Sequence, residues 1–382
     1  MYSVLQVTPA LDAGGVERTT IEMAEAITRA GGLALVASAG GRLERELEAA
    51  GGELVRLPVD SKNPITVALN AGRLARAAKA RNINVIHARS RAPAWSAWMA
   101  ARRLKLPFVT TFHGIYNGRT ALKRFYNSIM AKGDLVIANS EYTRAHVMQQ
   151  YKLPADRVVA IPRGVDVDQF DPDKVTPSEI AAMRASWGLT PNDARFVLIL
   201  PARLTRWKGQ RVLIDAMARV NANRPGAVKA ILAGDAQGRR GYEQELKATI
   251  MALGLRDDVA IVGHIGQMNV ALAAADAVAV PSVEPEAFGR SAVEAQAMAK
   301  PVIAAAHGGL AETVADGLTG LLVPPGDAAA LAQAIEQLID LGPEGRGVMG
   351  RKGRDRVRRL YAKSVLQAST LQVYDRLLGA RS

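Results

Sequence analysis

The chain has 382 residues, 49% of them hydrophobic, and this length exceeds what one ordinary core accommodates, so we expect a folded protein of two domains. It contains no cysteine, which excludes disulfides, thiol catalysis and cysteine-ligated metals, and its five histidines lack the spacing of a zinc site. The formal net charge of +13 is uneven, because residues 1–150 carry 20 Lys and Arg against 11 Asp and Glu.

Short apolar runs alternate with helical stretches along the whole chain. In the first half, YSVLQVT, LALVASA, VIHAR, PFVTTF and LVIANS predict buried strands, and ERTTIEMAEAITRAGG has helical spacing that ends on two glycines. After residue 190, RFVLILPA, VKAILAGD, VAIVGH, AVAVPS, PVIAA and TGLLVP repeat the pattern. Alternation of this kind predicts parallel sheets covered by helices, so we predict two successive doubly wound α/β units.

The segment AIPRGVDVDQFDPDKVTPSE is dense in Pro, Asp and Gly and predicts the linker. We therefore place one domain at residues 1–165, a second at 166–360, and a carboxyl-terminal helix, residues 361–382, that packs back on the first domain. Ligands of open α/β sheets bind at the carboxyl ends of the strands, so we expect a site in the cleft between the two domains. With no run of about 18 apolar residues and no secretory signal, the expected compartment is the cytoplasm.

Two motifs of the first half follow predicted strands. In DAGGVERTTIEMA, Gly14 and Gly15 allow backbone N–H groups to approach a phosphate or sugar at a helix N-terminus. The segment lacks GxGxxG and the acidic partner of a dinucleotide fingerprint, so a purely structural turn is the alternative. In TTFHG, His113 follows a strand, where an imidazole could contact a sugar hydroxyl or phosphate, move a proton, or serve only structurally.

Cations gather in the second part of the first domain. The cluster consists of Arg102, Arg103, Lys105, Arg119, Lys123, Arg124 and Lys132. It suits an anionic lipid surface, a phosphorylated glycolipid or nucleic acid, and a solubilising surface would look the same. Aromatic residues are only 5% of the chain and do not interleave with these cations, so we expect no nucleic-acid binding.

The second domain opens with LPARLTRWKGQRVLIDA, in which Arg203 and Lys208 lie between a strand and a helix. Two cations that converge on one loop suit a diphosphate, although ordinary surface cations give the same pattern. The segment is not a P-loop, because GxxxxGK[ST] is absent.

The segment PSVEPEAFGRSAVEAQAMAKPVIAA places Glu286 just before a predicted helix and Glu294 inside it. The N–H groups near Phe288, Gly289 and Arg290 form the helix N-terminus, which is a natural seat for phosphate oxygens. Carboxylates accept hydrogen bonds from vicinal hydroxyls, so one glutamate on each side of a diphosphate suits a nucleotide sugar. A helix cap followed by an exposed helical glutamate is the alternative.

Two further motifs are weaker. Asp-x-Asp occurs at residues 166–168 and 171–173 and could suggest Mg²⁺ on a diphosphate, but turn-forming aspartates are expected in a linker, so we expect no metal. The segment HGGLAE, residues 307–312, is a second glycine-rich turn for which a phosphate or sugar contact and simple packing are both open.

These segments together resemble a known family. EPEAFGRSAVEAQAMAKPVIAAAHGGLAETVADGLTGLLVPPGD, preceded by PARLTRWKGQRVLIDA, GGVERTTIEMA and VVAIPRGVDVDQF, is similar to family 4 of the retaining glycosyltransferases. The resemblance covers nearly the whole chain and implies the α/β GT-B fold, in which two Rossmann-like doubly wound domains face a central cleft. It implies that the first domain receives the acceptor and the second binds a UDP- or GDP-linked sugar, without a cofactor or a metal.

The resemblance also implies roles for individual residues. Glu286 would contact hydroxyls of the donor sugar and Glu294 would hold the ribose, while His113 would lie near the C6 hydroxyl of the sugar and the reaction centre. The expected catalytic residues are His113, Glu286, Arg203 and Lys208. The expected donor-binding residues are Gly15, Arg203, Lys208, Glu286, Phe288, Gly289, Arg290 and Glu294.

The expected function is transfer of a hexose to a glycan or lipid-linked acceptor in lipopolysaccharide or other envelope polysaccharide biosynthesis. The basic first domain suits such an acceptor and a peripheral contact with the anionic inner face of the cytoplasmic membrane. A GT-B sugar-nucleotide epimerase, which needs no acceptor, is the alternative enzyme. A basic nucleic-acid-binding protein is the alternative from another class.

Overall fold

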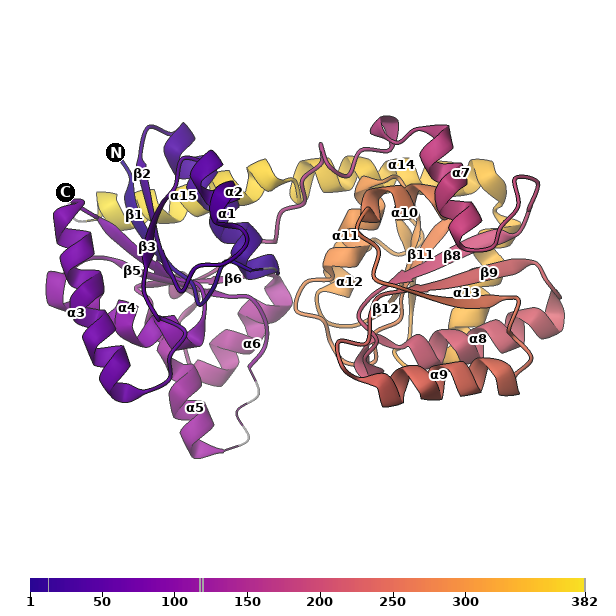
Figure 1. The fold of residues 1–382 in the computed structure, drawn as a ribbon, viewed down its shortest axis with the longest axis horizontal. Coiled ribbons are helices and arrows are strands. Elements are labelled where there is room, and N and C mark those ends of the chain that lie inside the picture. Colours follow the sequence, from indigo (N-terminus) through magenta and orange to yellow (C-terminus); the bar gives the residue numbers. More distant parts are fainter. Residues whose placement is uncertain (13, 117, 119, 381–382) are drawn as a thin grey trace. The chain divides into compact units, whose positions relative to one another are not determined.

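The computed structural model describes residues 1–382 except residues 13, 117, 119 and 381–382. The chain divides into two compact units, which Figure 1 shows. Unit 1 is Met1–Gly164 together with Lys363–Ser382, and unit 2 is Val165–Ala362.

The sheet of unit 1 is parallel and, over the described residues, has seven strands in the order β3-β2-β1-β4-β5-β6-β7. Its strands are β1 (Ser3–Val7), β2 (Leu33–Ser38), β3 (Glu53–Arg56), β4 (Val85–Ala88), β5 (Phe108–Phe112), β6 (Leu135–Ala138) and β7 (Val158–Ala160). The order along the sheet reverses between β1 and β4, which is the switch point of a doubly wound fold.

Helices cover both faces of this sheet (Figure 1). They are α1 (Gly15–Arg29), α2 (Glu44–Ala49), α3 (Pro64–Ala80), α4 (Arg91–Leu104), α5 (Ala121–Ser128), α6 (Glu141–Tyr151) and α15 (Lys363–Gly379), with short 3₁₀ turns η1 (Ile129–Lys132) and η2 (Ala155–Arg157). Successive residues of a strand point to opposite faces, so Leu5 packs in the core under α3 and α4 while Val4 packs under α1 and α15. Asn63 begins α3 because its side chain accepts from the N–H of Ile65.

The last helix, α15, is tied into unit 1 by polar contacts as well as by its apolar face. The hydroxyl of Tyr374 lies 2.7 Å from Nδ1 of the buried His87. The amide of Gln367 donates to the carbonyl of Glu22 on α1 over 2.7 Å. Burial raises the pKa of Tyr374 to about 12, so its hydroxyl keeps its proton at neutral pH.

The sheet of unit 2 is also parallel and, in the described part of the chain, has six strands in the order β10-β9-β8-β11-β12-β13. They are β8 (Phe196–Pro201), β9 (Val228–Ala233), β10 (Val259–Gly263), β11 (Ala277–Val280), β12 (Val302–Ala305) and β13 (Gly320–Val323). Here the order reverses between β8 and β11.

Two hydrophobic clusters, one on each face of this sheet, form the core of unit 2. The helices are α7 (Pro177–Ser186), α8 (Gln210–Asn223), α9 (Arg240–Ala252), α10 (Met268–Ala274), α11 (Arg290–Ala297), α12 (Leu310–Thr313), α13 (Ala328–Asp340) and α14 (Gly342–Leu360), with 3₁₀ turns η3 (Pro172–Lys174) and η4 (Arg206–Lys208). Helices α8, α9 and α13 pack on one face, and α10 and α11 pack on the other.

The predicted fold class of two doubly wound α/β units is confirmed, and every strand predicted from an apolar run is present. Strands β3 and β7, at the two edges of the first sheet, are short and were not predicted. The basic stretch after residue 342 divides into α14, which belongs to unit 2, and α15, which belongs to unit 1. Among the helices that the structure describes, none is both long and apolar enough to cross a membrane.

Candidate active site

Two loops of unit 2 leave the carboxyl ends of β8 and β11, which are neighbours at the switch point of the sheet. The first loop carries Arg203 and runs through η4, which ends at Lys208. The second carries Glu286 and leads into α11. Both loops were predicted to bind the donor, and the topology brings them to one edge of one sheet, where doubly wound folds bind their ligands.

The backbones of these two loops touch. The N–H of Val283 donates to the carbonyl of Trp207 over 2.8 Å. Gly209 has φ +76°, and a Cβ at this position would lie 1.9 Å from the carbonyl oxygen of Pro281. Only glycine satisfies both the left-handed backbone and the close approach, so Gly209 fixes how near Lys208 comes to the second loop.

Lys208 and Glu286 form an ion pair, with Nζ 2.7 Å from Oε1. The hydroxyl of Ser282 donates to the same carboxylate oxygen. Only 13% of the Lys208 side chain and 9% of the Glu286 side chain are exposed, so solvent screens this pair weakly. The ammonium group retains further N–H donors and the carboxylate retains further lone pairs, so each can bind a polar ligand while the pair stays formed.

Helix α11 presents its N-terminus beside this pair. Gly289 caps the helix with φ +92°, and a Cβ there would lie 2.5 Å from Cδ2 of Leu310. The first N–H groups of a helix have no partner within it and attract anions. Phe288, just before the cap, is buried, and its ring packs edge to face against that of Tyr361 at a centroid distance of 5.6 Å. This contact supports the loop that leads into α11.

Glu294 lies one turn into α11 and pairs with Arg290, whose Nε is 2.6 Å from Oε1 of the glutamate. Burial raises the pKa of the Glu294 carboxyl above its usual 4.5, and the charge and hydrogen bond of Arg290 oppose this rise. The alternative of an exposed helical glutamate is therefore wrong. Arg290 also has a role that the spacing did not reveal, as the partner of Glu294.

The glycine-rich turn after β12 supports the loop of Glu286. The N–H of Gly309 donates to the carbonyl of Glu286 over 2.7 Å, and a Cβ on Gly308 would lie 2.5 Å from the same oxygen. Nε2 of His307 lies 2.8 Å from the carbonyl oxygen of Ser282. Of the two interpretations open for HGGLAE, packing is the one that the contacts support. The supporting roles of Ser282 and His307 were not predicted, because no motif signals them.

Arg203 is held less tightly than Lys208. Its Nη1 donates to Oε1 of Gln237 over 3.2 Å, and its own carbonyl accepts from Nε2 of the buried Gln210 over 2.9 Å. The backbone of Arg203 is thus anchored to α8, while its guanidinium lies near the surface, where it has room to contact a ligand.

The two site residues predicted for unit 1 lie at the carboxyl edge of its own sheet. His113 follows β5, and both its ring nitrogens are buried without a hydrogen-bond partner among the described residues. Burial, followed by the charges of Arg163 and Arg89, lowers the pKa of His113 well below 6.5, so its imidazole is neutral at neutral pH. Gly15 begins α1 against the guanidinium of Arg163, where a Cβ would lie 2.0 Å from Nη1.

The linker aspartates act in turns. Oδ1 of Asp166 accepts from the N–H of Asp168 over 3.0 Å, and Oδ1 of Asp171 accepts from the N–H of Asp173 over 3.1 Å. Asp171 and Asp173 both pair with Arg354 on α14. These contacts match the turn-forming role expected of a linker.

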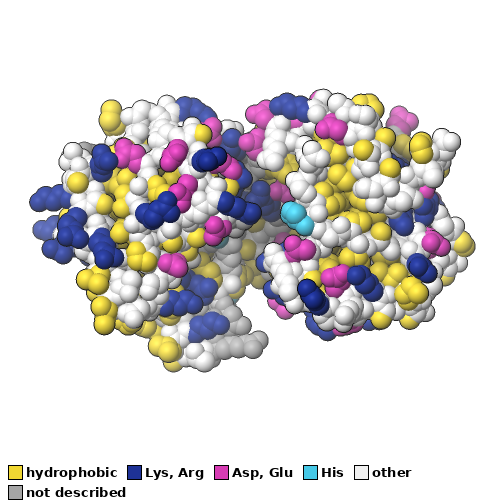
Figure 2. All heavy atoms as spheres, in the orientation of Figure 1, with side chains coloured by type: hydrophobic (Ala, Val, Ile, Leu, Met, Phe, Trp, Pro, Cys, Tyr) yellow, Lys and Arg dark blue, Asp and Glu magenta, His cyan; other side chains and the backbone are white. Residues whose placement is uncertain are grey.

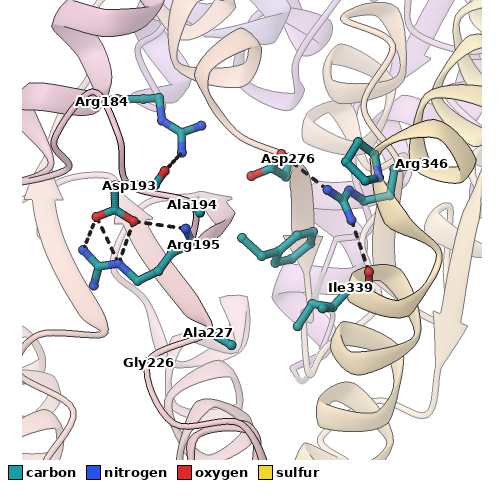
Figure 3. Close-up of a pocket in the computed structure, with 11 residues that line it drawn as sticks. Arg184, Asp193, Ala194, Arg195, Gly226, Ala227, Asp276, Ile339 and Arg346 are labelled. Atoms are coloured by element: carbon teal, nitrogen blue, oxygen red, sulfur yellow. Dashed lines mark hydrogen bonds and ion pairs between the residues drawn. The ribbon is translucent and has the colours of Figure 1, made fainter.

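Figure 3 shows a cavity of about 650 Å³ at the opposite, amino-terminal edge of the sheet of unit 2, lined by residues that include Arg184, Arg195 and Arg346. Its charges are satisfied by their neighbours. Arg195 pairs with Asp193 at 2.6 Å, and Arg346 lies 3.8 Å from Asp276. None of the predicted site residues lines this cavity. We therefore place the candidate active site at the carboxyl-terminal edge of the sheet, where the two loops lie.

Two models of protein families match parts of the chain that contain the candidate site residues. Residues 184–356 match the family model described as glycosyl transferases group 1, and residues 13–169 match the model described as glycosyltransferase family 4. The first match contains both loops of unit 2, and the second contains Gly15 and His113.

Individual relatives of the chain are glycosyltransferases by name. A D-inositol 3-phosphate glycosyltransferase of Xylanimonas cellulosilytica is 31% identical over 76% of this chain and 71% of its own length. The enzyme of the same name from Segniliparus rotundus is 33% identical over 67% of this chain, and the alignment spans only 58% of that protein.

Two solved structures resemble the protein over nearly its whole length. A glycosyltransferase from Rickettsia africae has a TM-score of 0.90 at 35% identity, covering 99% of this chain and 98% of its own. Anabaena HepE in complex with UDP has a TM-score of 0.84 at 27% identity, covering 98% of this chain and 100% of its own. The two family matches and these relatives agree with the two loops found at the switch point of unit 2. They show that the chain belongs to glycosyltransferase family 4, with the GT-B fold.

Proposed function

We propose that the protein transfers a hexose from a nucleotide diphosphate sugar to a hydroxyl of a glycan or glycolipid, with retention of configuration. The observation that carries this proposal is the buried pair of Lys208 and Glu286 beside the N-terminus of α11. A cation, a carboxylate and a helix N-terminus at one sheet edge supply what a sugar diphosphate needs: positive charge for the phosphates and acceptors for the hydroxyls.

The diphosphate would be bound by positive groups from both loops. Nζ of Lys208, the guanidinium of Arg203 and the first N–H groups of α11 would donate to its oxygens. Lys208 and the first N–H groups of α11 are held in place before the reaction begins, so they would stabilise the negative charge that develops on the leaving diphosphate. This supply of positive charge supports a reaction without a metal ion, and the effect of EDTA tests it.

The two glutamates would bind the sugars at either end of the diphosphate. Glu286, held by Lys208 and Ser282, would accept from hydroxyls of the hexose. Glu294, held by Arg290, would accept from the ribose hydroxyls. Phe288 and Gly289 would shape the wall between them.

Retention would follow from attack on the same face that the leaving group departs from. The bond from C1 of the hexose to the phosphate oxygen breaks, the bond from C1 to the acceptor oxygen forms, and the acceptor proton passes to the departing phosphate oxygen. Neutral His113 would donate a hydrogen bond to a hydroxyl of the reacting sugar. A protonated imidazole could also donate this bond, but burial disfavours the protonated form.

Solved structures of one relative contain uridine nucleotides. Structures of HepE, at 26% to 27% identity, contain UDP, UDP with glucose, and UDP-glucose. We therefore propose a UDP-linked hexose as donor, ahead of a GDP-linked one. The acceptor could belong to lipopolysaccharide or another envelope polysaccharide, and the name of the curated relatives points to a phosphate-bearing acceptor as a feature worth testing.

The cationic cluster of unit 1 supports a peripheral membrane contact in part. Arg102, in the last turn of α4, pairs with Asp134 at 3.1 Å. Part of the positive charge of the cluster is therefore neutralised within unit 1. Lys123 and Arg124 lie on the exposed α5, whereas Arg119 lies outside the described residues. Neutralising Arg102, Arg103, Lys123 and Arg124 together should reduce binding to anionic vesicles in a sedimentation assay, and unchanged binding would contradict a membrane role.

The first test of the proposal is thermal stabilisation by UDP, GDP, ADP and their hexose conjugates, with and without EDTA. A ligand at 100 times its Kd stabilises the native state by about 2.7 kcal/mol, which is readily measured. We expect a uridine ligand to stabilise the protein regardless of EDTA and Glu294→Ala to abolish the effect. Glu284→Ala, which removes an exposed glutamate of the loop that precedes α11, is the matched control. Stabilisation by no nucleotide would overturn the donor assignment.

A second test separates the transferase from an epimerase. An epimerase converts the sugar of the donor in the absence of any acceptor, whereas a transferase consumes donor productively only when an acceptor is present. Incubation of the protein with UDP-glucose alone, followed by analysis of the nucleotide sugar, should return UDP-glucose with at most slow hydrolysis. A new UDP-hexose epimer would support the alternative.

A further inference from the structure

Two adjoining cavities lie in unit 1, apart from all the candidate site residues described above. The first, of about 690 Å³, lies where β1 and β4 end, because its lining includes Pro9 after β1 and Ser90 after β4. The second, of about 360 Å³, lies between α3, α4 and α5. They share four lining residues, Lys62, Ala92, Leu122 and Tyr126, so the two cavities lie side by side, and we treat them together as one depression.

The first cavity is suited to an anion. Lys62, Arg91 and Lys123 line it, and Asp60 is the one carboxylate among the described lining residues. Helix α4 begins at Arg91, and its first N–H groups add to the positive potential. It also lies at the switch point of the sheet, where this fold class binds ligands. We call it the basic cavity.

The second cavity is apolar. Its lining includes the large apolar side chains of Val67, Trp95, Met99, Leu122 and Phe125. Leu122 and Phe125 are 79% and 63% exposed, which is unusual for side chains of this size on one short helix. Figure 2 shows hydrophobic side chains interspersed with Lys and Arg over the surface of this unit. We call it the apolar cavity.

A buried donor at the wall of the apolar cavity has no acceptor. The indole N–H of Trp95, which packs against Phe125 at a ring distance of 5.3 Å, is buried without a hydrogen-bond partner among the described residues. Buried indole N–H groups normally find an acceptor. An ester oxygen of a lipid whose chain lies in the apolar cavity would supply one.

We infer that this depression binds an anionic amphiphile, with its phosphate in the basic cavity and its hydrocarbon chain in the apolar cavity. The inference deepens the proposed function, on which it rests, by naming the acceptor class as a lipid-borne phosphate rather than a soluble phosphorylated sugar or cyclitol. Charge complementarity selects an anionic head, and the adjacency of the two cavities selects a molecule that carries an apolar chain directly beside that head.

Short-chain lipids test the inference directly by isothermal titration calorimetry with the full chain. The probes are dioctanoyl phosphatidic acid below its micelle threshold, glycerol 1-phosphate, and dioctanoyl phosphatidylcholine. We expect the phosphatidic acid to bind at least tenfold more tightly than either of the others, because only it fills both cavities with matching chemistry. Equal affinity for glycerol 1-phosphate would indicate a soluble phosphorylated acceptor and overturn the inference.

Variants assign the binding to the two cavities. Phe125→Ser should weaken phosphatidic acid about tenfold and leave glycerol 1-phosphate unchanged, whereas Lys123→Gln, at an exposed residue that lines only the basic cavity, should weaken both anions. Leu69→Ser and Lys79→Gln are matched controls, since Leu69 is 56% exposed on α3 and both residues line a different cavity. Equal losses in the controls would contradict the assignment. All four variants change exposed side chains, so they should remain folded.

A spectroscopic probe and a donor assay complete the test. A brominated octanoyl chain should quench tryptophan fluorescence in the wild type and quench it much less in Trp95→Phe, and the same quenching in both would place the chain elsewhere. UDP stabilisation, measured in the same samples, reports on the donor site. If UDP fails to stabilise the protein while phosphatidic acid binds, the proposed donor is wrong and the lipid site stands; the reverse result refutes only the lipid site.

Discussion

Lys208 and Glu286 are 78 residues apart in the sequence, yet their charged atoms lie 2.7 Å apart because their loops follow neighbouring strands. The pair is nearly buried, and Ser282 holds the same carboxylate oxygen. A charge buried in this way is stable only with its partner, so each residue keeps the other in place, in addition to the ligand-binding role proposed for it. The predictions below separate these two roles.

Removing one partner should damage both stability and catalysis. Lys208→Met leaves the Glu286 carboxylate buried without its cation, so the free energy of unfolding should fall by about 3 kcal/mol. The variant should also lose about 10²-fold to 10³-fold in kcat, because a donor to the leaving diphosphate is gone. Denaturant unfolding and steady-state kinetics measure the two effects.

The double variant Lys208→Met, Glu286→Gln separates the roles. It should recover part of the lost stability, since no charge remains buried, but none of the activity. Arg206→Met is the matched control, because the ion pair of Arg206 with Glu245 is exposed and is worth less than about 1 kcal/mol. A loss of stability in the control as large as in Lys208→Met would show that burial of the pair is not the cause.

Gly209 should be essential for the approach of the two loops. Gly209→Ala places a Cβ against the carbonyl of Pro281, so the loops must separate and UDP binding should weaken at least tenfold. Gly188→Ala is a close control, since Gly188 has φ +77° against +76° for Gly209, but a Cβ on Gly188 would have no atom within 4 Å. Both variants carry the cost of a left-handed backbone, about 1 kcal/mol. Equal UDP affinity in the two variants would refute a specific role of the contact.

Donor affinity should depend on pH through Glu294. Its pKa lies above 4.5 because it is buried, and ribose hydroxyls donate to its charged form, so binding releases a proton near that pKa. The affinity for UDP-glucose, whose phosphates do not titrate in this range, should therefore rise with pH above 4.5 until the carboxyl is fully ionised. Glu294→Gln should show weaker, pH-independent binding by calorimetry. Equal pH dependence in both proteins would exclude Glu294 as the titrating group.

Two buried histidines should make unit 1 sensitive to acid. Burial lowers the pKa values of His87 and His113 well below 6.5, so the native state holds both rings neutral while the unfolded chain binds protons below that pH. Their contribution to stability is therefore present above pH 6.5 and is lost as the pH falls below it, by up to about 1.4 kcal/mol per pH unit for each ring. Thermal melts between pH 7.5 and 5.5 should show the loss, and His113→Asn should reduce its slope.

The architecture was predictable because buried parallel strands are apolar throughout. Runs such as AVAVPS and RFVLILPA mark central strands of unit 2, and both are present as β11 and β8. The edge strands β3 and β7 escaped prediction for the opposite reason. They are short and only partly buried, as ELVR of β3 shows, so their sequences carry little of the apolar signal.

The candidate site was predictable as a set of residues but not as a set of contacts. The spacing of Glu286 and Glu294 around a helix start led to the prediction that both bind the donor, which the variants above test. It could not indicate that Glu286 pairs with Lys208 or that His307 holds the carbonyl of Ser282, because these contacts join segments that meet only at the switch point. Long-range contacts of this kind depend on strand order, which local sequence does not encode.

The anchoring of α15 in unit 1 determines the order in which the two units can finish folding during translation. Residues 165–362 contain the whole core of unit 2, so this unit is complete when residue 362 has left the ribosome. Unit 1 starts first but lacks one of the two partners of His87 until Tyr374 is translated. Residues 1–164 must therefore wait, with part of one face of their sheet uncovered, for α15, and a nonsense mutation just after residue 362 would damage unit 1 rather than unit 2.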